Sequence, residues 1–154
     1  DKFLKSNPEP CSHAIVSVDI MNLSKVAIDL IDYGIKNILI EKPAGINRNQ
    51  IRLIDKVAKN NNTKVFIGYN RRFYASILKA KKMIEEDGGI SSFTFDFTEW
   101  SSSIKDLNHD SEIKQKWLLA NSSHVIDLAF YLGGKPDQIN CYYSDKYNHE
   151  IQDL

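Results

Sequence analysis

The sequence predicts an α/β fold with a parallel, doubly wound sheet, and three observations support this. Short apolar runs of strand length alternate with stretches of helical periodicity between residues 13 and 69. The connections between them are short, which is typical of parallel strands joined through helices. After residue 72 the pattern changes to that of a strand wet on one face. We therefore predict part of a doubly wound domain over residues 1–72, and the start of a second domain with a half-exposed strand over residues 73–154.

The first strand and helix are predicted from their apolar spacing. Residues 13–18 are a β-branched run too continuous for a strand with one wet face, so we expect a buried parallel strand. From Asn22 to Gly34 the apolar residues have helical spacing, and Gly34 fits the left-handed cap of a helix. Residues 37–40 are a second strand, which ends at Glu41-Lys42-Pro43 because proline cannot donate to a central ladder.

The next helix and strand complete the pattern. The helix begins after Asn47, a residue type that caps helix N-termini well, and ends in the asparagine run of residues 60–62. Residues 64–69 form a third strand. Three strands that alternate with two helices imply right-handed crossovers, and we expect the sheet to be covered by helices on both faces.

The second half of the chain is less regular. Apolar spacing predicts a helix over residues 73–84 that ends near the following Asp-Gly-Gly. Residues 90–100 alternate with period two, which predicts a strand wet on one side, and residues 101–110 are a polar loop. An apolar helix begins at residue 122 or 123 and ends at Gly133-Gly134, and residues 138–143 are a further candidate strand.

Composition excludes several classes of partner. The chain has 154 residues, with 20 Lys+Arg against 20 Asp+Glu, so no net charge draws it to nucleic acid or to an anionic membrane. No apolar run approaches the roughly 18 residues that span a bilayer. Cys11 and Cys141 have no neighbours at ligand spacing, so we expect no metal site and no disulfide. We expect a cytoplasmic protein.

Ligands of an open parallel sheet bind beyond the carboxyl ends of its strands, so the residues after each strand are candidates for a binding site. Lys42 is the most informative of them, because an ammonium held at a strand end and stiffened by the following proline can contact a substrate oxygen. The alternative is that strands often simply end in charged residues and proline. The candidate positions are residues 17–19 after the first strand, residues 41–45 after the second and residues 69–73 after the third.

Three motifs, taken in order, resemble the Gfo/Idh/MocA family of NAD(P)-dependent oxidoreductases. They are residues 34–45 with Glu41-Lys42-Pro43, residues 65–73 with Asn70-Arg71-Arg72, and residues 123–128 followed by Gly133-Gly134. The resemblance implies that residues 1–72 are the second half of a Rossmann domain, with its doubly wound parallel sheet. It implies that residues 73–154 begin an α/β C-terminal domain with an open, mainly antiparallel sheet. It also implies hydride transfer between a nicotinamide cofactor, NAD or NADP, and a sugar, nucleotide-sugar or polyol.

The same resemblance implies roles for individual residues. Lys42 and His124 match the family's catalytic lysine and histidine, and an imidazole with a pKa of about 6.5 is suited to accept a hydroxyl proton. We therefore expect these two side chains to meet across a crevice. The positions expected to line the cofactor are Ser17, Val18, Asp19, Glu41, Lys42, Asn70 and Arg71.

Two features depart from the family pattern. Ala120 lies four positions before His124, where many members have Asp. No Gly-x-Gly-x-x-Gly turn occurs in the sequence, although that turn supplies most of the phosphate-binding geometry of a dinucleotide site. We therefore expect the sequence to be an internal fragment that binds NAD(P) poorly by itself.

Three functions stay open at this point. The leading one is a fragment of a dehydrogenase or reductase that acts on a sugar-like small molecule. The second is a catalytically impaired, family-like binding or regulatory protein, which Ala120 favours. The third is a different doubly wound protein, since fold does not fix function. In the full-length protein we also expect a homo-oligomer that forms through the C-terminal sheet.

Overall fold

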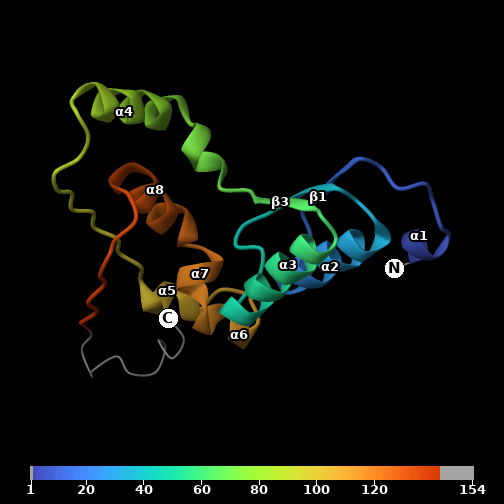
Figure 1. The fold of residues 1–154 in the computed structure, drawn as a ribbon. Coiled ribbons are helices and arrows are strands. Elements are labelled where there is room, and N and C mark those ends of the chain that lie inside the picture. The colour runs from blue at the N-terminus through green and yellow to red at the C-terminus, as the bar shows by residue number, and fades with distance from the viewer. Residues whose placement is uncertain (1, 143–154) are drawn as a thin grey trace. The chain divides into compact units, whose positions relative to one another are not determined.

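The computed structural model describes residues 2–142 and divides the chain into two compact units. The first unit is residues 1–68 and the second is residues 69–154, so the division lies close to the boundary that the sequence places after residue 72. Figure 1 shows the elements of each unit along the chain. We describe each unit by itself.

The first unit contains a parallel three-stranded sheet in the order β1-β2-β3, which confirms the predicted α/β class. Its strands and main helices follow the predicted order, although β1 and β3 each end two residues earlier than predicted. A short helix α1 and a 3-10 turn η1 were not predicted. The elements are α1 (Lys2–Lys5), β1 (His13–Val16), η1 (Ile20–Asn22), α2 (Leu23–Tyr33), β2 (Asn37–Ile40), α3 (Arg48–Asn60) and β3 (Lys64–Ile67).

Both predicted caps of the main helices are present. Gly34 follows α2 with φ 106°, a left-handed conformation in which glycine meets no Cβ penalty, and its N–H donates to the carbonyls of Leu30 and Ile31. Asn47 precedes α3, and its side-chain oxygen accepts the N–H of Gln50 at 2.9 Å. These caps fix where α2 ends and α3 begins, and so set the lengths of the loops at either end of the strands.

The core of the first unit lies between the sheet and the two helices. α2 packs against β1, β2 and α3, and α3 packs against β3. The buried apolar cluster comes from all of these elements except β3, whose Val65 and Ile67 pack against it while remaining half-buried. The fully or nearly buried members are Val16, Leu23, Ala27, Ile31, Ile35, Ile38, Ile40, Ala44, Ile54 and Ala58.

The prediction that helices cover both faces of the sheet was wrong for the described residues. Ile15, Leu39 and Phe66 are paired across the three strands, and their exposed fractions are 74%, 41% and 58%. Consecutive right-handed crossovers between strands in the order β1-β2-β3 place their helices on the same face. The described part of the chain therefore leaves the row Ile15, Leu39 and Phe66 open, and we call it the open row.

The second unit is built from helices and extended segments. Helices α4 and α8 confirm the two predicted helices, while α5, α6 and α7 lie where the sequence predicted a polar loop or gave no element. The bounds are η2 (Asn70–Phe73), α4 (Ala75–Glu86), α5 (Ser101–Lys105), α6 (Ser111–Gln115), α7 (Trp117–Ala120) and α8 (Ser123–Gly133).

The strand predicted over residues 90–100 was wrong, because the structure assigns no strand between residues 69 and 142. Period-two spacing marks an extended segment, but a strand also needs a hydrogen-bonded neighbour. Phe93 and Phe95 instead stack on each other, with ring centroids 6.4 Å apart. Residues 138–142 form no strand either, and Tyr143 of the same prediction lies outside the described residues.

Candidate functional site

The carboxyl ends of the three strands meet at one edge of the sheet, as parallel strands require. The N–H of Glu41 donates to the carbonyl of Val16 at 2.9 Å, and the N–H of Gly68 donates to the carbonyl of Ile40 at 2.7 Å. These bonds continue the sheet by one residue past β2 and β3. Within the first unit, the residues after β1 and the Glu41-Lys42 pair therefore lie at the same edge.

Lys42 is held by a loop that the fold fixes on both sides. The Lys42–Pro43 peptide bond is cis, and Pro43 and Ala44 are buried. The backbone N–H of Lys42 donates to a carboxylate oxygen of Glu41 at 2.8 Å. Further along, the N–H of Ile46 donates to Gln50 Oε1 at 3.0 Å. The backbone that carries the half-buried Lys42 side chain is thus anchored to both the sheet and α3.

Gly68 allows this edge to be tightly packed. A Cβ at this position would lie 3.3 Å from the carbonyl oxygen of Ile40 and 3.7 Å from the Cα of Glu41. Those neighbours are backbone atoms, which cannot turn away as a side chain can. A side chain at position 68 would therefore push β3 away from the segment that presents Lys42.

The turn after β1 has a different character. Ser17, Val18 and Asp19 are exposed. The Asp19 carboxylate accepts the N–H of Met21 at 3.0 Å, so it caps the short turn η1. This position is thus already occupied by a negative charge.

His124 lies in the first turn of α8 in the second unit. Its ring meets the Tyr69 ring edge to face, with centroids 5.7 Å apart and planes at 84°. His124 Nδ1 is buried, as are the residues Ser122 and Ser123 that precede it. Burial raises the pKa of the Tyr69 hydroxyl above its ordinary value, an effect that a hydrogen bond with Ser123 partly offsets.

Arg72 and Asp127 form a two-bonded ion pair beside this ring contact. Arg72 Nε donates to Asp127 Oδ2 at 2.7 Å, and Arg72 Nη2 donates to Asp127 Oδ1. The Asp127 side chain is only 11% exposed. The bond to Asp127 raises the pKa of the Arg72 guanidinium further above its usual range. This pair ties η2 to α8 within the second unit.

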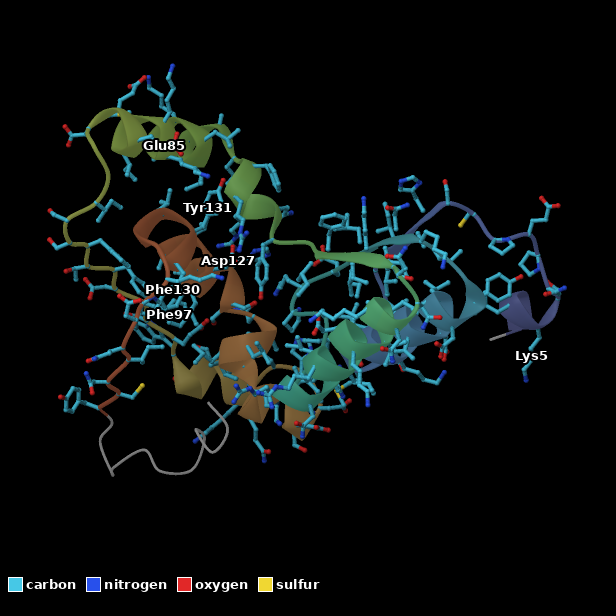
Figure 2. The ribbon with its side chains drawn as sticks, viewed as in Figure 1. Lys5, Glu85, Phe97, Asp127, Phe130 and Tyr131 are labelled. Atoms are coloured by element: carbon cyan, nitrogen blue, oxygen red, sulfur yellow. The ribbon has the colours of Figure 1, made fainter. Side chains whose placement is uncertain are left out.

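Aromatic rings flank the guanidinium of Arg72. Its central carbon lies 5.0 Å from the centroid of the Tyr131 ring and 5.7 Å from that of Tyr69. Lys81 Nζ lies 4.6 Å from the Tyr131 centroid. Figure 2 labels Asp127 and Tyr131, which both project from α8. Tyr69, Arg72, His124 and Asp127, which we call the η2–α8 cluster, thus form one set of direct contacts.

The predicted site residues are divided between the units. Glu41 and Lys42 belong to the first unit, whereas Asn70, Arg71 and His124 belong to the second. Their assignment to a catalytic or cofactor site remains a prediction.

Sequence reasoning did not identify the contacts of Tyr69, Arg72 and Asp127. The signal for them was present: Asp127 follows His124 by three residues on a helix, so the two share a face. The sequence did not show which arginine would reach that face.

Two further searches gave no site in the described part of the chain. No group of three or more His, Cys, Asp or Glu residues between residues 2 and 142 is arranged to hold a metal ion. In the same range, no helix is both long enough and apolar enough to cross a bilayer. The two cysteines, Cys11 and Cys141, are free and exposed.

Comparison with known proteins identifies the fold. No family model matches the chain, and no curated protein matches it in sequence. Solved structures do match. A dehydrogenase from Chromobacterium violaceum has a TM-score of 0.66 at 17% identity, covering 88% of this chain and 40% of that one. A protein provisionally assigned as a myo-inositol dehydrogenase from Sinorhizobium meliloti 1021 has a TM-score of 0.63 at 19% identity, covering 84% and 39%.

An NAD-binding protein from Listeria innocua has a TM-score of 0.59 at 19% identity, covering 82% of this chain and 38% of that one. At these identities the likeness shows that the chain shares a fold with these three proteins. The chain spans about two fifths of the length of these three structures.

Proposed function

We propose that this chain is part of an NAD(P)-dependent oxidoreductase of the Gfo/Idh/MocA type that acts on a sugar, nucleotide-sugar or polyol. The observation that carries the proposal is the anchored Glu41-Lys42-Pro43 loop at the carboxyl edge of the sheet, on a fold shared with dehydrogenases. In such folds this edge is where ligands bind. The sugar-like substrate rests on the motif resemblance and on the assigned activity of the Sinorhizobium meliloti protein.

In this proposal, Lys42 and His124 both act on the reacting hydroxyl group: Lys42 holds its oxygen, and His124 accepts its proton. A carbinol that loses hydride must also lose its hydroxyl proton. The Lys42 ammonium would donate a hydrogen bond to the oxygen and hold it in place, while the His124 imidazole would accept the proton. Glu41 contributes indirectly, since its carboxylate binds the backbone N–H of Lys42 and stiffens the loop.

The described residues do not fit the pyrophosphate of a dinucleotide. Phosphates bind at a helix N-terminus with glycines that let the backbone come close. In the turn after β1, the Asp19 carboxylate accepts a hydrogen bond from the N–H of Met21 instead. This carboxylate is negatively charged and would repel a phosphate. We therefore propose that a longer protein completes the cofactor site. The 154-residue chain alone should bind NADH or NADPH weakly in a fluorescence titration.

The test of the proposal is the variant Lys42→Ala in the full-length protein, assayed for nicotinamide reduction with a panel of polyols and sugars. Loss of the ammonium that holds the reacting oxygen should lower kcat at least about 100-fold, while the Kd for the cofactor changes less than about threefold. Lys59→Ala is the matched control, because Lys59 is an exposed lysine of the same unit that pairs with Asp55. An unchanged kcat in Lys42→Ala would show that the assigned role is wrong.

Ala120 supports a second candidate function, that of a binding or regulatory protein without turnover. Ala120 is buried one turn before α8, at the position where many members of the resembled family carry Asp. A full-length protein that binds NAD or NADP but transfers no hydride to any substrate of the panel would favour this function over the first.

A further inference from the structure

We propose that Tyr69 and Arg72 are positioning residues that fix the orientation of the His124 ring. Tyr69 acts by packing on the ring, and Arg72 acts through Asp127. The two contacts involved are the edge-to-face packing of Tyr69 on His124 and the two-bonded pair of Arg72 with Asp127. The inference deepens the proposed function, because ring orientation matters for catalysis only if His124 accepts a proton. The orientation itself is measurable without any activity.

The spacing of the four residues makes the two contacts act together. Tyr69 is the residue before η2 and Arg72 lies within it; the N–H of Arg72 donates to the carbonyl of Tyr69 at 3.2 Å, and the guanidinium carbon lies 5.7 Å from the Tyr69 ring centroid. His124 and Asp127 are three residues apart, on one face of α8. The cluster therefore consists of two parallel contacts between the same two elements. One contact alone would let α8 turn about it, whereas two fix both its distance and its rotation.

The chemistry of the ion pair favours one geometry. A guanidinium that donates two parallel hydrogen bonds to a carboxylate fixes the plane of that carboxylate, which a lysine ammonium cannot do. Asp127 is largely buried, so the loss of Arg72 would leave a charge without its partner in a poorly solvated place. The rings of Tyr69 and Tyr131 lie beside the guanidinium and restrict its own movement.

The ring contact acts directly on His124. Edge-to-face packing orients two aromatic rings relative to each other, unlike the contact of a ring with an aliphatic side chain. His124 Nδ1 is buried, and a half-turn of the ring would put the carbon Cδ2 in its place and move Nε2 to the position of Cε1. The orientation of the ring therefore decides where its nitrogens lie and which partner they can reach for proton transfer. Tyr69 and the Arg72–Asp127 pair together select one of these arrangements.

The experiment is side-chain NMR of the 154-residue chain, with the His124 ring signal assigned by its loss in His124→Asn. In the unmodified chain we expect nuclear Overhauser contacts between the His124 and Tyr69 rings. Arg72→Ala and Asp127→Asn should each abolish these contacts and shift the His124 signal. Arg72→Lys should restore them only in part, because one ammonium cannot reproduce two parallel bonds.

The matched control is Lys82→Ala, which removes a cation from the exposed pair of Lys82 with Glu86 in the same unit. This variant should leave the His124 signal unchanged. Should Arg72→Ala fail to fold, as judged by far-ultraviolet circular dichroism, Asp127→Asn provides the same test, because it removes the charge that Arg72 pairs with and leaves both aromatic side chains present. Intact ring contacts in the folded variant would overturn the inference.

Activity separates this inference from the proposed function. In the full-length protein, Arg72→Ala should lower kcat about 10-fold to 100-fold with KM changed less than about threefold, and Arg72→Lys should recover part of the loss. If the ring contacts are lost and kcat does not change, the positioning inference holds and the catalytic role of His124 is wrong. If the ring contacts persist, the inference fails whatever the activity.

Discussion

Different kinds of contact stabilise each of the two units of this chain internally. In the first unit, ten buried apolar residues form one cluster between a sheet and two helices. In the second unit, the described buried residues are Ile113, Ala120, Ser122 and Ser123, and the connections between elements include the Arg72–Asp127 pair. Apolar burial is non-directional and depends on area, whereas a polar pair depends on exact placement. The first unit is thus stabilised mainly by apolar burial, whereas polar pairs in the second unit fix the relative placement of its own elements.

The largest effect is expected where the apolar core of the first unit is opened. Ile38→Ala should lower the free energy of unfolding by about 2–5 kcal/mol, because it removes buried methyl groups and leaves a cavity. Leu39→Ala is the matched control, since Leu39 is the next residue of β2 and lies in the open row, 41% exposed. It should cost less than about 1 kcal/mol.

Urea unfolding would measure the free energy of unfolding of both variants, and native-state hydrogen exchange would locate the change along the chain. In Ile38→Ala, the backbone amides of β1, β2 and β3 should lose protection from exchange. Equal costs for the two variants would show that the open row is covered in solution, and would contradict the contrast between the two faces of the sheet.

A smaller effect is expected for a polar contact in the second unit. The Ser122 hydroxyl donates to Glu99 Oε1 at 2.5 Å, and Ser122 is 2% exposed. Ser122→Ala should cost about 1 kcal/mol, because the exposed Glu99 carboxylate can bind water instead. Hydrogen exchange should report the loss in α8 and leave the three strands unchanged. If protection were lost in the strands instead, the Ser122 contact would also stabilise the first unit, and the contrast between the two units would be wrong.

The smallest effect is a pH dependence confined to alkaline solution. Burial raises the pKa of Tyr69 above its ordinary value of 10.0. The unfolded chain therefore releases this proton first, so the stability that the neutral Tyr69 provides is complete below about pH 10 and decreases as the pH rises further.

Tyr69→Phe should remove this part of the decrease, because phenylalanine has no proton to release. Urea unfolding of the second unit at several pH values above 9 would measure it. An identical decrease in the two proteins would show that the Tyr69 hydroxyl ionises alike in the folded and unfolded states.

Much of the first unit could be predicted from sequence, because its signals are local and repeat along the chain. The apolar spacing of α2 and α3, the cap residues Gly34 and Asn47, and the apolar strands all act within a few residues. The second unit was predicted less well. The period-two pattern of residues 90–100 was a local signal without a partner strand, and the short helices between residues 101 and 120 have too few residues for a clear periodicity.

The sequence by itself determined the α/β class, the order of strands and helices, and the presence of Lys42 at the end of a strand. Only the tertiary structure decided that Arg72, and not Arg71, bonds to Asp127, that Tyr69 packs on His124, and that the open row is left uncovered in the described residues. The reason is physical. Periodicity and capping depend on neighbours along the chain, whereas the partner of a side chain 55 residues away depends on how helices are placed in space.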